Sequence, residues 1–245
     1  MLTQPPITLH VLPPSHPCRT AEAALTYKGL TYELVNLALG KHQDEVEQIY
    51  GEGNRTVPGM LIGDEDIHGS TAITWRLEQL FPGKPLYPEP VAETVREAEL
   101  WADREFQDLG RRLPWSALHF RPESLGTFGG AAALDPAGTD YAIKLVRATW
   151  KYHSITAEKL AADLEALPGM IDRIEAFADE GLIDGEQPTA ADFQIGATAR
   201  VLLTVGDLHP VFEGSAAERI ARSQFADYPG LVPAGAFPEG WVRGR

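Results

Sequence analysis

The sequence predicts an α/β domain followed by an all-α domain, and three observations support this prediction. Strand-like and helix-like patterns alternate over residues 1–83. Residues 84–91 contain three prolines and are expected to form a linker. Residues 92–245 carry mostly helical patterns and end in an irregular tail. Alternating strands and helices followed by helices alone are typical of an α/β domain joined to a helical one.

The first domain is expected to begin with a β-α-β unit. Apolar and polar residues alternate over 7–12, which predicts a strand. The apolar residues of 17–28 then recur at helical spacing and stop at Gly29, a residue favoured after a helix C-terminus. Residues 31–35 are predicted to form the second strand. A single helix connecting two strands usually places them side by side and parallel.

A β-hairpin and a further helix complete the predicted first domain. A short helix is expected over 44–50. Residues 56–62 and 67–68 flank an acidic turn, which is the pattern of a hairpin. The next helix is expected to begin near Gly69 and to end at Pro82. The predicted order of elements is therefore β-α-β-α-β-β-α.

The second domain is predicted to be helical. A long pattern over 91–112 is rich in Glu early and in Arg late, as the helix dipole favours. A break rich in Gly, Pro and Ala follows at 120–138. Further helices are expected over 141–153, 155–166, 169–179 and 188–203. The last twenty residues are expected to pack as an irregular tail.

Composition narrows the classes of function. The 44% hydrophobic and 23% charged residues are near the averages of folded proteins. The formal charge of −14 repels phosphate backbones and anionic lipid headgroups, so neither nucleic acid nor a membrane is an expected partner. No apolar run approaches the roughly 20 residues of a spanning helix, and the start of the sequence lacks a signal-peptide pattern. A single cysteine forms no intramolecular disulfide, which favours a cytoplasmic location.

Four residues between the first strand and the first helix carry a chemical signal: Ser15, His16, Pro17 and Cys18. Backbone N–H groups at a helix N-terminus stabilise a thiolate or another anion. A hydroxyl or thiol at this place could hydrogen-bond and activate a bound sulfur. The simpler interpretation is that Ser15 caps the helix and Cys18 is an inert apolar residue of its first turn.

Two later segments offer binding groups of their own. Pro58 follows Val57 directly ahead of a strand, which suggests a special turn or only a strand start. Gly69, Ser70 and Thr71 open a helix, where free N–H groups and a hydroxyl form either a carboxylate site or an ordinary N-cap.

Taken together, these motifs resemble the N-terminal domain of cytosolic glutathione transferases, which is a thioredoxin-like domain. The resemblance covers about residues 7–88, and residues 188–192 resemble a capping box of the family's helical domain. It implies a glutathione-transferase-like fold in which Thr189 and Asp192 are a structural pair. It also implies a homodimer, by analogy with the family.

The resemblance implies a role for each motif. Ser15 lies where many members place the Ser or Cys that contacts the glutathione sulfur, with His16 beside it. Cys18 lies where glutaredoxin-like relatives have a second cysteine. Val57 would hydrogen-bond the cysteinyl unit through its backbone, with Pro58 as the cis-proline. Gly69 and Ser70 would form the site of the γ-glutamyl carboxylate.

The sequence also departs from the family pattern. Gly69 stands where the family usually has Glu, which removes a carboxylate that faces the ligand. Thr56 stands where a basic residue is common, and Arg55 lies one step earlier. The extra residue His16 shifts the Ser15 assignment by up to one position. These departures indicate a divergent member that uses glutathione, another low-molecular-weight thiol, or none.

In the helical half, aromatic residues are candidates for an apolar substrate pocket, although core packing is the more common role of such residues. The candidates are Trp101, Phe106 and Trp115, with Phe120, Tyr141 and Trp150 as further possibilities. Arg111 and Arg112 offer charge to an acidic co-substrate or simply form a solvated helix end. The seven histidines show no metal-ligand spacing, so no metal is expected.

The leading hypothesis is an enzyme that conjugates glutathione to a small electrophile. In this hypothesis, the start of the first helix lowers the pKa of the bound thiol. One alternative makes Cys18 the reactive group of a glutathione-dependent thiol-disulfide oxidoreductase, which with one cysteine is limited to a monothiol route. Another is a non-catalytic binding module that keeps the fold.

Overall fold

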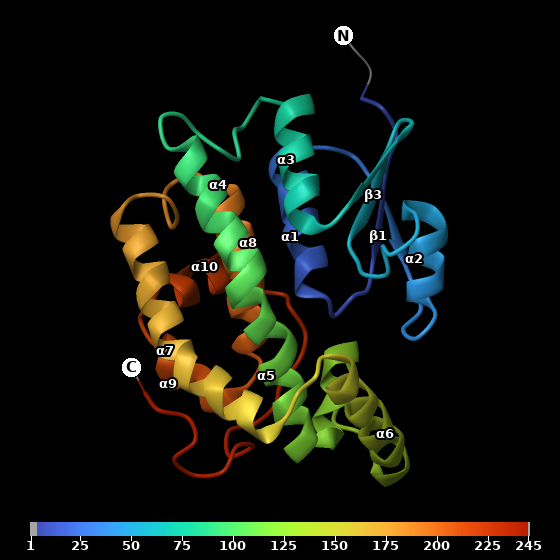
Figure 1. Cartoon of the computed structure of the whole chain (residues 1–245), viewed down its shortest axis with the longest axis vertical. Helices are drawn as coiled ribbons and strands as arrows, with labels where there is room; N and C mark the ends of the chain where they lie inside the picture. The colour runs from blue at the N-terminus through green and yellow to red at the C-terminus, as the bar shows by residue number, and fades with distance from the viewer. Residues whose placement is uncertain (1–3, 245) are drawn as a thin grey trace.

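A four-stranded mixed sheet forms the centre of the first domain in the computed structural model, which describes residues 4–244 (Figure 1). The strands lie in the order β2-β1-β3-β4. Their bounds are β1 Ile7–Val11, β2 Glu33–Asn36, β3 Gly59–Ile62 and β4 Glu65–His68. β1 is parallel to β2, and β3 is antiparallel to both β1 and β4. The predicted β-α-β unit and the hairpin are confirmed.

Helices cover both faces of this sheet. α1 (His16–Tyr27) and α3 (Ser70–Leu80) lie on the face toward the helical domain, and α2 (His42–Tyr50) lies on the other (Figure 1). The inward side chains of β1 and β3 are fully or almost fully buried, as the alternation of apolar residues predicts. This first domain is thioredoxin-like.

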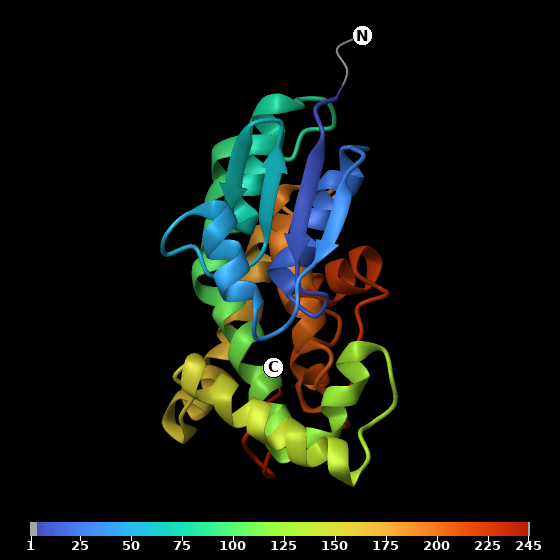
Figure 2. The same ribbon diagram turned by 90° about the vertical axis from the view of Figure 1, so that its right-hand side faces the viewer.

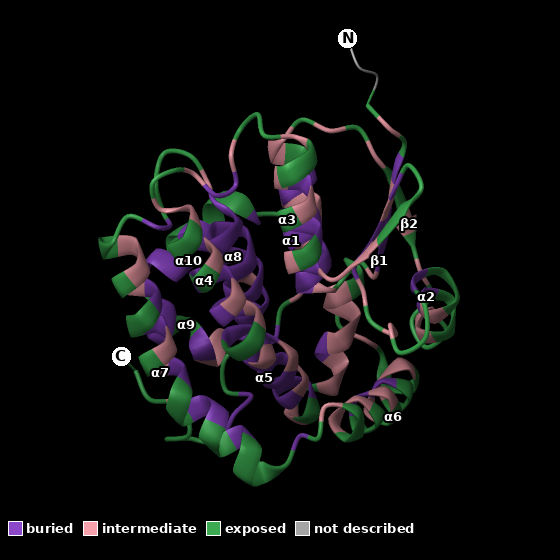
Figure 3. Cartoon of the chain, turned by 45° about the horizontal axis from the view of Figure 1, so that its top comes forward, coloured by how far each residue is buried: buried purple, intermediate pink, exposed green. Residues whose placement is uncertain are grey.

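The second domain is helical, and its central helix is buried along almost its whole length (Figure 3). Its α-helices are α4 Ala92–Trp101, α5 Gln107–Phe120, α6 Pro136–Tyr152, α7 Ala157–Asp179, the central α8 Ala190–Leu202, α9 His209–Phe212 and α10 Ala216–Gln224. Short helical turns of other types lie at Ala102–Phe106, Pro122–Gly129 and Gly206–Leu208. At the start of α8, Thr189 and Asp192 form the predicted capping box.

One expectation about the helices needs correction. The predicted helices 155–166 and 169–179 are one helix, α7, which continues through Pro168. Buried Leu164, Leu167 and Ile171 keep one apolar face on both sides of the proline, and their packing offsets the lost backbone hydrogen bond.

α10 was not predicted, because its nine residues are mostly polar. The signal that identifies its start is local. Ser215 accepts a hydrogen bond from the N–H of Glu218, whose carboxylate accepts one from the N–H of Gly214.

The two domains share a polar interface as well as an apolar one. The Thr20 hydroxyl on α1 donates to the carbonyl of Phe193 on α8 at 3.2 Å. Between α3 and α4, the fully buried Glu99 carboxylate accepts hydrogen bonds from Thr74, Tyr87 and Arg96. Burial raises the pKa of Glu99.

No helix among residues 4–244 is long and apolar enough to cross a membrane.

Candidate functional site

The sheet brings the hairpin turn and the start of α3 together. His10, near the end of β1, pairs with Gly59 at the start of β3, which pairs with His68 at the end of β4. Pro58 precedes Gly59 and Gly69 follows His68. The N–H of Gly69 donates to the carbonyl of Pro58 at 2.9 Å. The loop from β1 to α1 leaves the sheet at this same end (Figure 2).

The turn ahead of β3 has the conformation that the resemblance implies. The Val57–Pro58 peptide bond is cis. Val57 is partly buried and packs against the core, and Pro58 is buried. The imidazole Nε2 of His68 lies 2.7 Å from the carbonyl oxygen of Thr56 and so connects β4 to this turn.

The start of α3 explains why glycine is present where a larger residue was expected. Gly69 is the N-cap and has φ +95°, a conformation that residues with a Cβ rarely adopt. A Cβ at this position would meet no atom within 4 Å, so the backbone conformation rather than crowding favours glycine. Ser70 is the first helical residue and is 3% exposed.

The loop that leads into α1 contacts the C-terminal tail through a hydrogen bond from Tyr228. Ser15 is the N-cap with extended backbone, and its side chain makes no capping hydrogen bond. Its carbonyl accepts from the N–H groups of Cys18 and Arg19 at 3.1 and 3.3 Å. The hydroxyl of Tyr228 donates to the carbonyl of Pro14. The sequence pattern did not identify this contact from the distant tail.

Cys18 has the surroundings of an inert core thiol. Its side chain is fully buried. Burial raises the pKa of the thiol to about 12, although a hydrogen bond with the Ser15 side chain opposes the shift. At neutral pH almost none of this thiol is thiolate, the form that attacks disulfides.

The imidazole of His16 is directed toward the helical domain. It is 5% exposed, and a Cβ built on Gly110 of α5 would lie 3.1 Å from its Nε2. That nitrogen is buried without a hydrogen-bond partner in the described chain. Burial first, and the positive charge of Arg111 second, lower the pKa of His16 to about 3. His16 is therefore neutral and belongs to the contact between the domains.

The buried Tyr50 ring packs against Gly59, directly after the turn at Pro58, and was not predicted to belong to this region. The Tyr50 hydroxyl lies 2.7 Å from Nδ1 of His10, and the Tyr50 ring contacts the ring of His68 with centroids 5.9 Å apart. A Cβ on Gly59 would be 2.3 Å from this ring. The glycine directly after Pro58 was the available signal, because glycine in a strand often marks a close approach.

Arg55 does not replace the basic residue expected at position 56. Its guanidinium pairs with Asp44 at 2.9 Å and with Glu47, both on α2. The positive charge of Arg55 is thus neutralised by two carboxylates of the first domain.

Two of the three aromatic candidates are core residues. Trp101 is 6% exposed, stacks on the fully buried Phe106 and lies edge-on to Phe177 of α7. Trp115 is partly buried, and its carbonyl accepts a hydrogen bond from the indole of Trp150 at 2.9 Å. Trp101 and Phe106 thus pack between helices.

The comparison with known families agrees with this geometry. Residues 9–85 match the family model described as glutathione S-transferase, N-terminal domain. The first domain is thus similar to the N-terminal domain of glutathione S-transferases. A comparison with curated protein sequences finds no match.

The fold of the glutathione S-transferase superfamily extends over both domains. Rice GST1 (OsGSTU1), solved in complex with glutathione, is 16% identical with a TM-score of 0.62, covering 94% of this chain and 93% of that one. FzlA from C. crescentus is 21% identical with a TM-score of 0.58, covering 94% and 96%. Beta-etherase LigF from Sphingobium sp. strain SYK-6 is 18% identical with a TM-score of 0.56, covering 89% and 99%. At these identities the likeness shows the fold alone.

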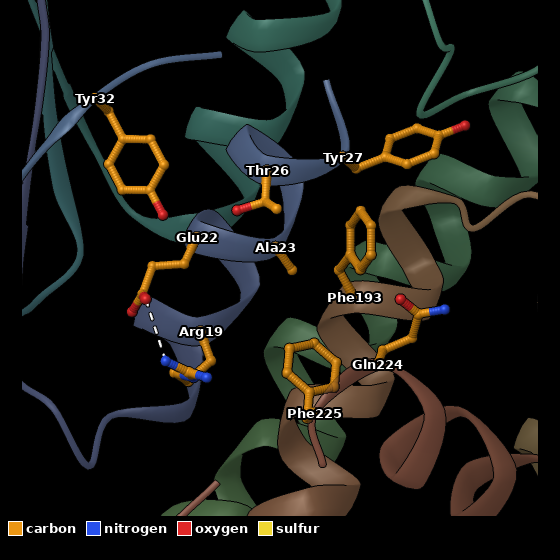
Figure 4. A pocket seen from close by; sticks show the side chains of 9 residues that line it. All are labelled: Arg19, Glu22, Ala23, Thr26, Tyr27, Tyr32, Phe193, Gln224 and Phe225. Atoms are coloured by element: carbon orange, nitrogen blue, oxygen red, sulfur yellow. Dashed lines mark hydrogen bonds and ion pairs between the residues drawn. The ribbon is translucent and has the colours of Figure 1, made fainter. Parts of the chain in front are cut away.

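Two clefts lie where the first domain meets the helical domain. The larger, of about 470 Å³, lies between the first domain, α5 and the end of α6. Its lining residues are Thr56, Asp108, Arg111, Arg112, Tyr152, His153 and Ser154. The other, of about 320 Å³, lies between α1, α8 and α10, with Arg19, Tyr27 and Phe225 among its lining residues (Figure 4). Neither is lined by Ser15, Val57 or Ser70.

The larger cleft adjoins the turn that precedes β3, because Thr56 lines it and directly precedes Val57. No group of three or more His, Cys, Asp or Glu side chains in the described residues is arranged to hold a metal ion.

Proposed function

We propose that this protein is a glutathione-transferase-like enzyme, which binds glutathione or a closely similar thiol and transfers it to a small electrophile. The hydrogen bond between Gly69 and Pro58 carries the proposal. It joins the turn that precedes β3 to the start of α3, at the sheet end where α1 begins. A small peptide thiol can contact all three segments only if they converge in this way.

Each segment would contact one part of the thiol. The N–H groups at the start of α3, with Ser70, would bind the γ-glutamyl carboxylate, since a helix N-terminus favours anions. The main chain of Val57 would pair with the cysteinyl unit. The sulfur would lie near Ser15 and the N-terminus of α1, where the helix dipole favours thiolate over thiol.

The reaction would be a nucleophilic substitution. The thiol proton passes to solvent, and the thiolate forms a carbon–sulfur bond to the electrophile. The leaving group departs with the electron pair of the broken bond. No redox partner is needed, because carbon is substituted and sulfur is not oxidised.

Ser15 is preferred over Cys18 as the residue near the sulfur. Burial and a pKa of about 12 oppose a reactive Cys18, and a mixed disulfide would require that thiol to reach a ligand. His16 would have no direct ligand contact because it faces α5. A homodimer in the cytoplasm is part of the proposal by analogy with the family.

Calorimetry with glutathione, followed by conjugation of 1-chloro-2,4-dinitrobenzene, tests the proposal. Wild-type protein should bind glutathione and release chloride at a rate above that of the uncatalysed reaction. Ser70→Ala should weaken binding, and Ser15→Ala should lower kcat more than it changes glutathione affinity. Absence of binding at millimolar thiol would refute the thiol site. Binding without conjugation of any electrophile would instead identify a non-catalytic binding module.

A further inference from the structure

We infer that the cleft between Thr56, α5 and the end of α6 holds the electrophile, and that this electrophile carries a carboxylate or similar anionic group bound by Arg111. This inference rests on the proposed function and names the substrate class of the same site. Hereafter this cavity, lined by the residues given above, is called the α5–α6 cleft.

The ion pairs of the two cleft arginines extend to Asp163 and Lys159 outside the lining, and this network has one cation in excess. Arg112 pairs with Asp163 at 2.6 and 3.0 Å and with Asp108 at 2.8 Å. The other oxygen of Asp108 lies 3.2 Å from Arg111. Lys159 also pairs with Asp163, at 3.2 Å. Three cations thus share two carboxylates.

Arg111 is the cation that remains available to a ligand. Its side chain is 37% exposed, whereas that of Arg112 is 11% exposed and held by two carboxylates. A guanidinium bonded to a single carboxylate oxygen keeps further N–H donors for a second anion. Arg111 lines the cleft, so such an anion would bind within it.

Two histidines on different elements lie close enough to Arg111 for its charge to affect their pKa values. His16 begins α1, and His153 follows α6. For each, burial lowers the pKa first and the charge of Arg111 lowers it second. The negative charge of Asp108 raises the pKa of His153, but this effect is smaller than the lowering by Arg111. An anionic group would therefore meet a favourable potential here, although the whole chain carries −14.

The position of the cleft relates it to the proposed sulfur site. Thr56 precedes Val57, and His16 follows Ser15. His16 also lies against Gly110, the neighbour of Arg111. An electrophile bound through Arg111 would thus lie between the domains, near the N-terminus of α1. A volume of about 470 Å³ suits a small aromatic or aliphatic acid.

A matched pair of electrophiles tests the inference. 4-Chloro-3-nitrobenzoate and its neutral amide, 4-chloro-3-nitrobenzamide, react in the same way. Glutathione thiolate forms a bond to the ring carbon that holds chlorine, chloride leaves with the electron pair, and the thiol proton passes to solvent. We compare kcat/KM for both in the wild type, in Arg111→Gln and in Arg147→Gln. Arg147 is exposed on α6 outside the cleft lining, so the control removes the same charge.

Arg111→Gln should lower kcat/KM for the benzoate about tenfold or more, the loss typical of a hydrogen bond to a charged group. It should leave the amide and the glutathione affinity within about twofold. Arg147→Gln should change neither substrate by more than about twofold. An equal loss for benzoate and amide, an equal loss in the control variant, or no loss would overturn the inference.

A binding measurement separates this inference from the proposed enzyme activity. Calorimetry with unreactive 3-nitrobenzoate and 3-nitrobenzamide needs no turnover. The wild type should bind the acid more tightly than the amide, and Arg111→Gln should remove that difference. Failure of glutathione to bind, with the preference for the acid intact, would refute the thiol site alone. Loss of the preference in a protein that conjugates the amide would refute the anion site alone.

Discussion

The main-chain N–H of Gly69 lies 2.9 Å from the carbonyl oxygen of Pro58 and donates a hydrogen bond to it. Gly69 reaches this position with φ +95°, which places the first turn of α3 beside the turn that precedes β3. The architecture of the proposed thiol site depends on this contact.

Replacing Gly69 by Ala should destabilise the protein. Gly69 has φ +95° and ψ 145°, a region almost restricted to glycine, where a residue with a Cβ loses about 1–3 kcal/mol even if no atom obstructs the side chain. Urea unfolding measures the change, and glutathione calorimetry should show weaker binding as α3 shifts. Gly83→Ala is the matched control, because Gly83 has no positive φ and its Cβ would also meet open space. Equal stabilities of the two variants would show that the conformation of Gly69 is not required.

Cys18 should resist alkylation in the folded protein. Its thiol is fully buried and has a pKa of about 12, so reaction with iodoacetamide at pH 8 should follow unfolding rather than direct attack. Mass spectrometry should find little label under native conditions and complete label in concentrated urea. Cys18→Ala should retain conjugation. Rapid native labelling, or loss of conjugation with intact folding, would restore Cys18 as a reactive residue.

His16 should make stability depend on pH. Its pKa is about 3 in the folded protein, against 6.5 for an unperturbed histidine, so the unfolded chain binds more protons between these values. The stability it contributes is complete above pH 6.5 and is lost as pH falls toward 3, by at most about 1.4 kcal/mol per pH unit. His16→Phe should reduce this slope in unfolding experiments from pH 7 to pH 4.

The exposed His119 offers a control for this measurement. His119→Phe should leave the slope as in the wild type. If His16→Phe also leaves it unchanged, the buried imidazole of His16 does not control the acid sensitivity of the domain contact.

Glu99 should be the most sensitive carboxylate for folding. Removing its side chain takes the carboxylate from the partly exposed Arg96 and the acceptor from the buried Tyr87 hydroxyl. Breaking a fully buried pair costs about 3–5 kcal/mol, and solvent reaches Arg96, so Glu99→Ala should lower the free energy of unfolding by about 3 kcal/mol. Glu97→Ala, at an exposed position of the same helix, should change it by less than about 0.5 kcal/mol. Similar losses in both variants would contradict the structural role of Glu99.

Motifs formed by residues close together in the sequence predicted much of this fold correctly. The capping box of Thr189 and Asp192 and the β3–β4 hairpin depend on neighbouring residues, and both are confirmed. Pro168 misled the prediction for α7 because a proline signal is local, whereas the packing that overrides it comes from other helices.

The sequence by itself determined the class of each domain, the order of the elements in the first domain and the motifs of the proposed thiol site. These properties depend on periodicity, capping and turn chemistry, which act over a few residues. Only the tertiary structure decided that Cys18 is buried, that His16 faces α5 and that Arg111 shares the Asp108 carboxylate with Arg112. Burial and electrostatic potential arise from residues far apart in the sequence, so no local pattern contains them.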